Sequence, residues 1–174
     1  MKKKIFLIII LSFIVSCKSD KKKELVINNN TTIYYLIRHA EKDRTNKENK
    51  NPNLTQEGVL RAAKWSLVFK NIIFDAVYST DYNRTRQTAL PTAEKNGLEL
   101  SYYNPSNINR KNFLFSNTGK TVLVVGHSNT TPQLVNTFLG TEKYSNIDDK
   151  NNANLYILTV SSDGEISDSL LVID

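Results

Sequence analysis

The sequence of 174 residues is poor in the residue types that cross-link a small protein or bind metals: it has one Cys, two His and one Trp. A single Cys excludes an intrachain disulfide and a Cys-based zinc cluster. Hydrophobic residues make up 40% and charged residues 23%, which excludes collagen, a coiled coil, extensive disorder and a polytopic membrane protein. The length predicts about one domain. Because His is so scarce, the position of each His is informative.

An excess of positive charge is confined to the N-terminus. The formal net charge is +6, but the first 24 residues hold seven Lys and two acids. The remaining residues carry 16 basic and 15 acidic side chains, so this part of the chain is nearly neutral. The charge therefore does not indicate a nucleic-acid partner, and we expect none.

The chain has one long hydrophobic run, and it lies close to the N-terminus. Ile5–Val15 is apolar except for Ser12 and follows three lysines. Eleven residues are too few to span a bilayer, which takes about 20 residues, and this layout is typical of a secretory signal. The run ends in Ile14–Cys17, which resembles the end of a bacterial lipoprotein signal, where the Cys is lipidated. A plain signal peptide or an uncleaved anchor is the alternative.

The domain organisation follows from that interpretation. We expect residues 1–16 to be a lipoprotein signal peptide, and Cys17 to carry the lipid at the start of a flexible tether that ends at residue 30. Lipidation also explains an unpaired Cys in an exported protein. The lipid would be the protein's membrane contact, in the bacterial cell envelope and facing the periplasm, with the outer membrane preferred because Lys18 follows Cys17. Residues 31–174 then form the catalytic domain.

Strand-like and helix-like segments alternate through this domain. Short apolar, β-branched runs predict strands, and apolar residues at helical spacing predict helices between them. The expected strands are 33–37, 74–78, 98–103, 121–125, 155–160 and 169–173, and the expected helices are 56–70, 81–95 and 132–139. Thr55 should cap the first helix, Pro91 should kink or divide the second, and Gly140 should end the third. The sum is a three-layer α/β/α sandwich with a mostly parallel central sheet.

Both histidines directly follow predicted strands. His39 comes after 33–37 together with Arg38, and His127 comes after 121–125, while Arg84 follows the strand 74–78. Ligands of parallel sheets bind at the carboxyl ends of the strands. Two guanidinium groups offer forked donors for phosphate oxygens, and a neutral imidazole among cations is a nucleophile for phosphorus. The pattern therefore indicates an anion site with a nucleophile.

Four motifs in this order resemble the histidine phosphatase (phosphoglycerate mutase-like) superfamily. Leu36–Glu41 is similar to its signature, with Ala40 where Gly is usual. Leu54–Gly58 is similar to its second motif, Tyr78–Ala89 to its Arg-containing motif, and Val124–His127 to the motif of its second His. The motifs cover about 33–140, and the short spacing between them resembles the short phosphatase branch of the superfamily.

The resemblance implies a metal-independent phosphatase without a cofactor. His39 would be the nucleophile that becomes phosphohistidine, while Arg38, Arg84 and His127 would bind the phosphate and stabilise its transfer. The substrate would be a small phosphate monoester, hydrolysed by an exported, lipid-anchored phosphomonoesterase. The superfamily's general acid lies in a segment that is short here, so the candidates are Glu41, Asp43 and Asp81, of which we favour Glu41. The alternative function is a phosphate- or anion-binding lipoprotein of the same fold with weak or no turnover.

Overall fold

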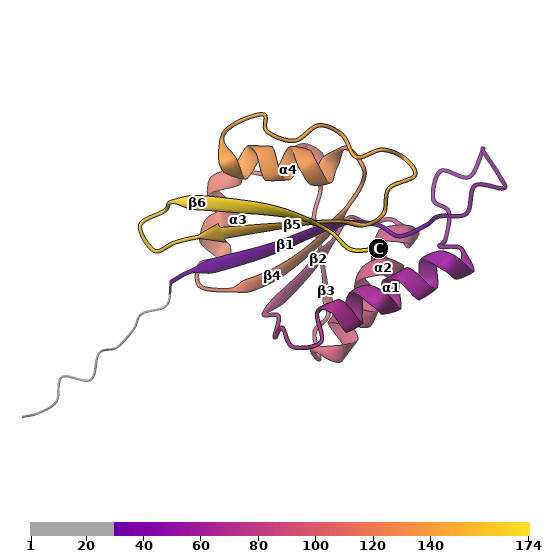
Figure 1. Ribbon diagram of the computed structural model, residues 1–174, viewed down its shortest axis with the longest axis horizontal. Coiled ribbons are helices and arrows are strands. Elements are labelled where there is room, and N and C mark those ends of the chain that lie inside the picture. The colour runs from indigo at the N-terminus through magenta and orange to yellow at the C-terminus, as the bar shows by residue number, and fades with distance from the viewer. Residues whose placement is uncertain (1–29) are drawn as a thin grey trace, which may run out of the picture.

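A six-stranded sheet organises residues 30–174, the part of the chain that the computed structural model describes (Figure 1). The strands are β1 (Thr32–Arg38), β2 (Ala76–Ser79), β3 (Leu100–Tyr102), β4 (Thr121–Gly126), β5 (Asn154–Val160) and β6 (Ile166–Val172). They lie in the order β3-β2-β4-β1-β5-β6. The expected signal peptide and Cys17 lie outside the described residues.

The sheet is mostly parallel, as the sequence predicts. Strands β1 to β4 run parallel, while β5 pairs antiparallel with β1 and β6 antiparallel with β5. Strand β4 lies between β2 and β1, and Val122–Gly126 are buried on both faces of the sheet. An uninterrupted β-branched run suits this position because no side of such a strand meets water. The expectation of a central strand at 121–125 is confirmed.

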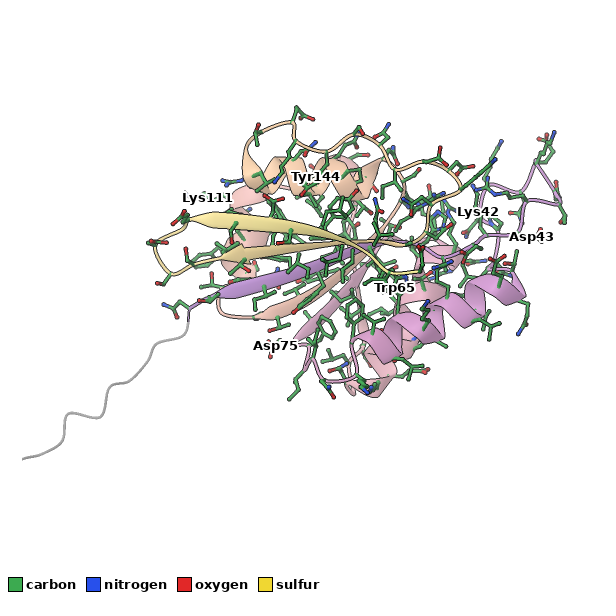
Figure 2. The ribbon with its side chains drawn as sticks, in the orientation of Figure 1. Lys42, Asp43, Trp65, Asp75, Lys111 and Tyr144 are labelled. Carbon is green, nitrogen blue, oxygen red and sulfur yellow. The ribbon has the colours of Figure 1, made fainter. Side chains whose placement is uncertain are left out.

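Helices cover both faces of the sheet and complete the three layers (Figure 1). They are α1 (Gln56–Val68), α2 (Asn83–Lys95), α3 (Arg110–Ser116) and α4 (Thr130–Leu139). Because side chains alternate along a strand, Leu36 packs in the core beneath α4 while Ile37 packs in the core beneath α1 and α2. Trp65 of α1 belongs to the latter core and is 2% exposed (Figure 2). No described helix is both long and apolar enough to cross a membrane.

The helix ends follow local chemistry. The Thr55 side chain accepts a hydrogen bond from the Gly58 N–H and caps α1, and Gly140 ends α4 in a left-handed conformation with φ of 75°. Helix α2 continues through Pro91 as one element, so of the two expected outcomes, a kink or a division, the division does not occur. Asp163 and Gly164 lie in the turn between β5 and β6, with Gly164 at a φ of 89°.

Helix α3 is the element that the sequence does not predict. It has seven residues, and Asn109 caps it by accepting from the Asn112 N–H. Phe113 and Leu114 pack against the core beneath α4. Two turns contain too few apolar residues to show a helical period, so the segment reads as an Asn-rich loop. A short 3-10 helix, Pro105–Asn107, precedes it.

Candidate active site

The strand register brings the two histidines together. Arg38 at the end of β1 is the register partner of Gly126 at the end of β4, so His39 and His127 each come one residue beyond a paired position. The His39 N–H donates to the Gly126 carbonyl at 2.9 Å, which extends the strand pairing to the first histidine. The two imidazole centroids lie 5.5 Å apart. The predicted convergence of both histidines at the carboxyl edge of the sheet is therefore present in the fold.

The His39 ring is held in one tautomer. Its Nδ1 lies 2.7 Å from the Ala40 carbonyl oxygen, and because a carbonyl can only accept, Nδ1 carries the proton. The lone pair is then on Nε2. Burial, together with the positive charges of Arg38, His127 and Arg84, lowers the pKa of His39 to about 3. The ring is neutral near pH 7, which is the state that a nucleophilic imidazole requires.

Two motifs that accompany the histidines in the sequence fix the His39 loop. Thr88 of α2 accepts a hydrogen bond from the Ala40 N–H at 2.9 Å and donates to the Arg84 carbonyl at 2.7 Å. Gly58 lies so close to the Glu41 backbone that a Cβ atom there would come 2.2 Å from the Glu41 carbonyl oxygen. The Leu54–Gly58 and Tyr78–Ala89 motifs thus position the His39 loop from two helices.

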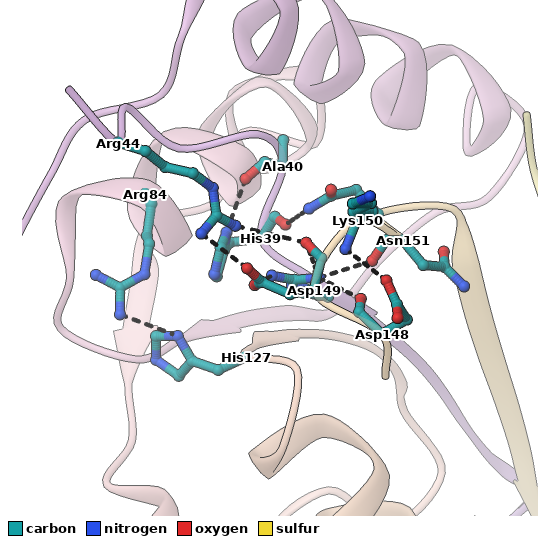
Figure 3. Close-up of polar contacts among 11 residues, drawn as sticks. His39, Ala40, Arg44, Arg84, His127, Asp148, Asp149, Lys150 and Asn151 are labelled. Carbon is teal, nitrogen blue, oxygen red and sulfur yellow. Dashed lines mark hydrogen bonds and ion pairs between the residues drawn. The ribbon is translucent and has the colours of Figure 1, made fainter. Parts of the chain in front are cut away.

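His127 connects to Arg84 on one side and to Thr80 on the other. The Arg84 guanidinium donates from Nη2 to His127 Nδ1 at 3.3 Å (Figure 3). His127 Nε2 lies 2.9 Å from Thr80 Oγ1. Because a guanidinium only donates, Nδ1 accepts and Nε2 carries the proton. Burial, followed by the charges of Arg84, Lys42 and Arg38, lowers the pKa of His127 to about 4. His127 is therefore also neutral in the empty site near pH 7.

Arg84 supplies donors that no described residue accepts. Its Nε and Nη1 atoms are buried and have no hydrogen-bond partner within the described part of the chain. The guanidinium carbon lies over the Tyr82 ring, 4.4 Å from its centroid, and this cation–π contact orients the guanidinium. Buried donors without an acceptor are costly, so their presence beside two histidines indicates a site for an oxyanion.

Arg38 is held quite differently, by the loop between α4 and β5. Its Nη1 donates to the carbonyls of Asp148 at 2.8 Å, Asp149 at 3.1 Å and Asn151 at 2.9 Å, and its Nη2 donates to Asp149 Oδ1 at 2.8 Å (Figure 3). The same loop provides Asn152, whose Nδ2 donates to the His39 carbonyl at 2.7 Å. Asp149 and Asn152 are site residues that the sequence does not reveal, since neither follows a strand nor belongs to a recognisable motif.

Two adjoining clefts open beside His39. One, of about 410 Å³, is lined by both histidines, both arginines, Lys42 and Asp149. The other, of about 490 Å³, is lined by His39, Glu41, Lys42, Arg61 and Asp149 among others. A polar cleft of this size accommodates a small phosphorylated molecule. Lys42 lines both clefts and adds a third positive charge to those of Arg38 and Arg84.

The three candidate acids lie in different surroundings. Glu41 lines the second cleft, where its Oε1 accepts from Arg61 Nε at 2.5 Å and its buried Oε2 has no partner among the described residues. Asp81 pairs with Arg86 at 2.7 Å and is largely exposed. Asp43 accepts from the Thr45 N–H and hydroxyl on the surface. Of the three, Glu41 alone lines a cleft with His39.

The described residues include no group of three or more His, Cys, Asp or Glu side chains placed to hold a metal ion. The site's positive charge comes instead from Arg38, Arg84 and Lys42, three side chains that line the cleft of the two histidines. Such side chains can bind and neutralise a phosphoryl group. The arrangement can therefore place a neutral imidazole nitrogen and several cationic donors around one phosphorus atom.

Comparison with known proteins bears on the family and the fold. Residues 34–104 match the family model of the histidine phosphatase superfamily, branch 1. The fold resembles those of several solved phosphatase structures. No curated protein matches the sequence.

Several solved structures have folds similar to that of this chain. SixA of Nakamurella multipartitia, named as a phosphohistidine phosphatase, has a TM-score of 0.58 and 19% identity, covering 83% of this chain and 95% of its own. A mycobacterial glucosyl-3-phosphoglycerate phosphatase has a TM-score of 0.65 and 14% identity, covering 82% and 98%. A phosphoserine phosphatase mutant from Entamoeba histolytica, solved with phosphoserine, has a TM-score of 0.63 and 15% identity, covering 80% and 96%. At these identities the likeness concerns the fold.

Proposed function

We propose that this chain is a phosphomonoesterase of the histidine phosphatase superfamily that forms a phosphohistidine on His39. The observation that carries the proposal is the His39 ring. Its Nδ1 is bound to the Ala40 carbonyl, its Nε2 has no hydrogen-bond partner among the described residues, and it lines one cleft with Arg84, two of whose donors also lack a described partner. The match of residues 34–104 to the superfamily and the phosphatase names of the structural neighbours support it.

The reaction consists of two displacements at phosphorus. In the first, the Nε2 lone pair of His39 forms a bond to phosphorus while the bond to the ester oxygen breaks, and the departing oxygen takes up a proton. In the second, water attacks phosphorus and returns a proton to the group that protonated the leaving oxygen, the P–N bond breaks, and inorganic phosphate leaves with neutral His39 restored. Arg38 and Arg84 stabilise the charge on the phosphoryl oxygens throughout, so positioning and electrostatics provide most of the acceleration.

His127 and Glu41 complete the proposed machinery. When a phosphoryl oxygen takes the Arg84 guanidinium, His127 Nδ1 loses its donor, and the nearby dianion favours protonation of the ring. The imidazolium then donates to the phosphoryl group. Glu41 is the proposed proton donor to the leaving oxygen, for which it has to take up a proton while one oxygen remains bound to Arg61. No metal or cofactor takes part in this scheme.

The cellular location is proposed from the sequence alone. We propose that the protein is exported and anchored in the bacterial envelope by lipid on Cys17, with residues 18–30 as the tether. Several acyl chains on one residue hold far more firmly than one chain. Replacement of Cys17 by Ser should move the protein from the membrane fraction to the soluble fraction, and unchanged membrane association would contradict lipidation.

A phosphate-binding protein without turnover is the second candidate, and one observation favours it. Two carboxylates that line a cleft with His39 are paired with arginine. Glu41 is paired with Arg61, and Asp149 is paired with both Arg38 and Arg44. A carboxylate paired in this way is an acceptor rather than a proton donor.

Hydrolysis of 4-nitrophenyl phosphate with chelator present separates the two candidates. We expect steady, chelator-resistant turnover that disappears in the variant His39→Ala. A burst of one product equivalent without further turnover would indicate a stalled phosphohistidine and support the binding protein. Activity that survives His39→Ala would contradict the proposed nucleophile.

A further inference from the structure

The Asp149 carboxylate lies where a ligand of Arg38 has to bind. Asp149 Oδ1 accepts from Arg38 Nη2 at 2.8 Å, and Asp149 lines both clefts beside His39 (Figure 3). Within the described part of the chain it is the single acidic residue that lines the cleft shared by the two histidines. Without a ligand, the Asp149 carboxylate thus accepts a hydrogen bond from the Arg38 guanidinium, as an oxygen of a phosphoryl group would.

Arg38 has few donors to spare for a ligand. Three loop carbonyls take up Nη1, so Nε and Nη2 remain, and Nε is buried without a partner among the described residues. These two atoms form one side of the guanidinium fork, which is the side that binds two oxygens of one anion. Asp149 Oδ1 accepts from Nη2, one of these two atoms, so an anion that binds on this side of the guanidinium competes with the carboxylate for Arg38.

The contact is built so that the carboxylate can move and the arginine cannot. The Arg38 side chain is 2% exposed, whereas Asp149 is 65% exposed. The second carboxylate oxygen, Oδ2, lies 2.8 Å from Nη1 of Arg44, which is itself largely exposed. Asp149 can therefore give up its hydrogen bond to Arg38 when a ligand binds there, and still keep its ion pair with Arg44 and its exposure to water.

We propose that Asp149 is an internal ligand of the phosphate site, which the substrate displaces from Arg38 on binding and which reclaims Arg38 as inorganic phosphate leaves. The inference rests on the proposed function for the identity of the substrate. Competition of this kind weakens substrate and product binding by the same factor, the fraction of molecules in which the site is open. It thereby limits inhibition by the phosphate that the reaction produces.

Isothermal titration of inorganic phosphate into the full chain tests the proposal, with Asp149→Asn as the variant. Loss of an ion pair with one exposed partner corresponds to about fivefold in affinity, so Asp149→Asn should bind phosphate about fivefold more tightly than the wild type. The Michaelis constant for 4-nitrophenyl phosphate and the inhibition constant for phosphate should fall together by the same factor.

Asp148→Asn is the matched control. It removes the same charge from the adjacent position of the same exposed loop, and the Asp148 side chain accepts from the Lys150 N–H rather than from Arg38. Its phosphate affinity should stay within about twofold of the wild type, because the Asp148 carboxylate makes no hydrogen bond to Arg38 and its exposed charge is screened. Equal tightening in both variants would reduce the effect to net charge and overturn the proposal.

Two other results would also overturn it. Weaker phosphate binding in Asp149→Asn, with an unchanged unfolding temperature, would show that Asp149 positions Arg38 for the ligand. Absence of phosphate binding in both the wild type and Asp149→Asn would show that no site lies beneath the carboxylate. Phosphate titration needs no turnover, so tighter binding in Asp149→Asn without any hydrolysis would contradict the proposed function and leave this inference standing.

Discussion

The two arginines of the site contrast in what they hold before any ligand arrives. Arg38 is almost completely buried and donates to three backbone carbonyls and one carboxylate. Arg84 is half-buried, stacks on Tyr82 and donates within the described chain to His127, with two buried nitrogens left over. The difference teaches that the Arg38 guanidinium is bound into the fold, while two donors of the Arg84 guanidinium are left for the ligand of the proposed function.

This contrast has a sequence origin. Arg38 ends a central strand, so its side chain meets the loop that enters the neighbouring strand β5, and that loop wraps its carbonyls around the charge. Arg84 lies in the first turn of α2, where it projects over the edge of the sheet toward His127. Substitutions at the two positions should therefore separate stability from binding.

Replacement of Arg38 should have the largest effect, because Arg38 both holds the 148–151 loop and is proposed to bind the phosphate. Arg38→Ala removes the donors of three loop carbonyls and of Asp149, which should lower the free energy of unfolding by about 2 kcal/mol and abolish phosphatase activity. Thermal unfolding followed by circular dichroism measures the first effect. An unchanged melting temperature would show that the 148–151 loop is held by other contacts.

Replacement of Arg84 should affect activity alone. Arg84→Met removes buried donors that lack partners, so the free energy of unfolding should change by less than about 1 kcal/mol, while kcat/KM should fall by about 10² to 10³. Steady-state kinetics beside the same melting experiment makes the comparison with Arg38→Ala direct. A melting temperature as low as that of Arg38→Ala would contradict a guanidinium reserved for the ligand.

Glu41 is paired with a third arginine, Arg61, and its replacement tests whether this carboxylate donates a proton or only holds Arg61. If Glu41 donates the proton, Glu41→Gln should slow hydrolysis of alkyl phosphates by about 10², since their leaving oxygen needs a proton, and should leave 4-nitrophenyl phosphate within about threefold. A series of substrates with different leaving groups provides the measurement. Equal losses across the series would assign Glu41 to positioning Arg61 instead.

Stability should also depend on pH, with the smallest effect of the four. Burial lowers the pKa of His39 to about 3 and that of His127 to about 4, both below the ordinary value of 6.5. Between these values and 6.5 the unfolded chain binds more protons than the folded chain, so the free energy of unfolding falls as the pH decreases. The melting temperature should drop from pH 7 to pH 5, and a double variant His39→Gln/His127→Gln should show a smaller drop.

The convergence of the two histidines could be predicted from the sequence because each lies two residues beyond an apolar run that forms a strand. The parallel pairing of β1 and β4 then makes the histidines neighbours. The Thr55 cap and the Gly140 stop are equally local, since each depends on one residue and its immediate surroundings.

The loop that holds Arg38 could not be predicted because its contacts are remote in sequence. Asp149 and Asn152 lie more than 100 residues from Arg38 and His39, in a polar segment without periodicity. Nothing in the residues 148–152 themselves distinguishes them from an ordinary surface turn. Helix α3 was missed for a related reason, since seven residues are too few to show a period.

The most direct test of the account is to identify the phosphorylated atom. The Ala40 carbonyl holds the Nδ1 proton of His39, so the phosphoryl group should form on Nε2. Rapid acid-free quenching during turnover of a phosphate ester, followed by peptide mass spectrometry and phosphorus NMR, should find the Nε2 isomer of phosphohistidine on His39. Phosphate on Nδ1, on His127 or on neither histidine during turnover would contradict the account.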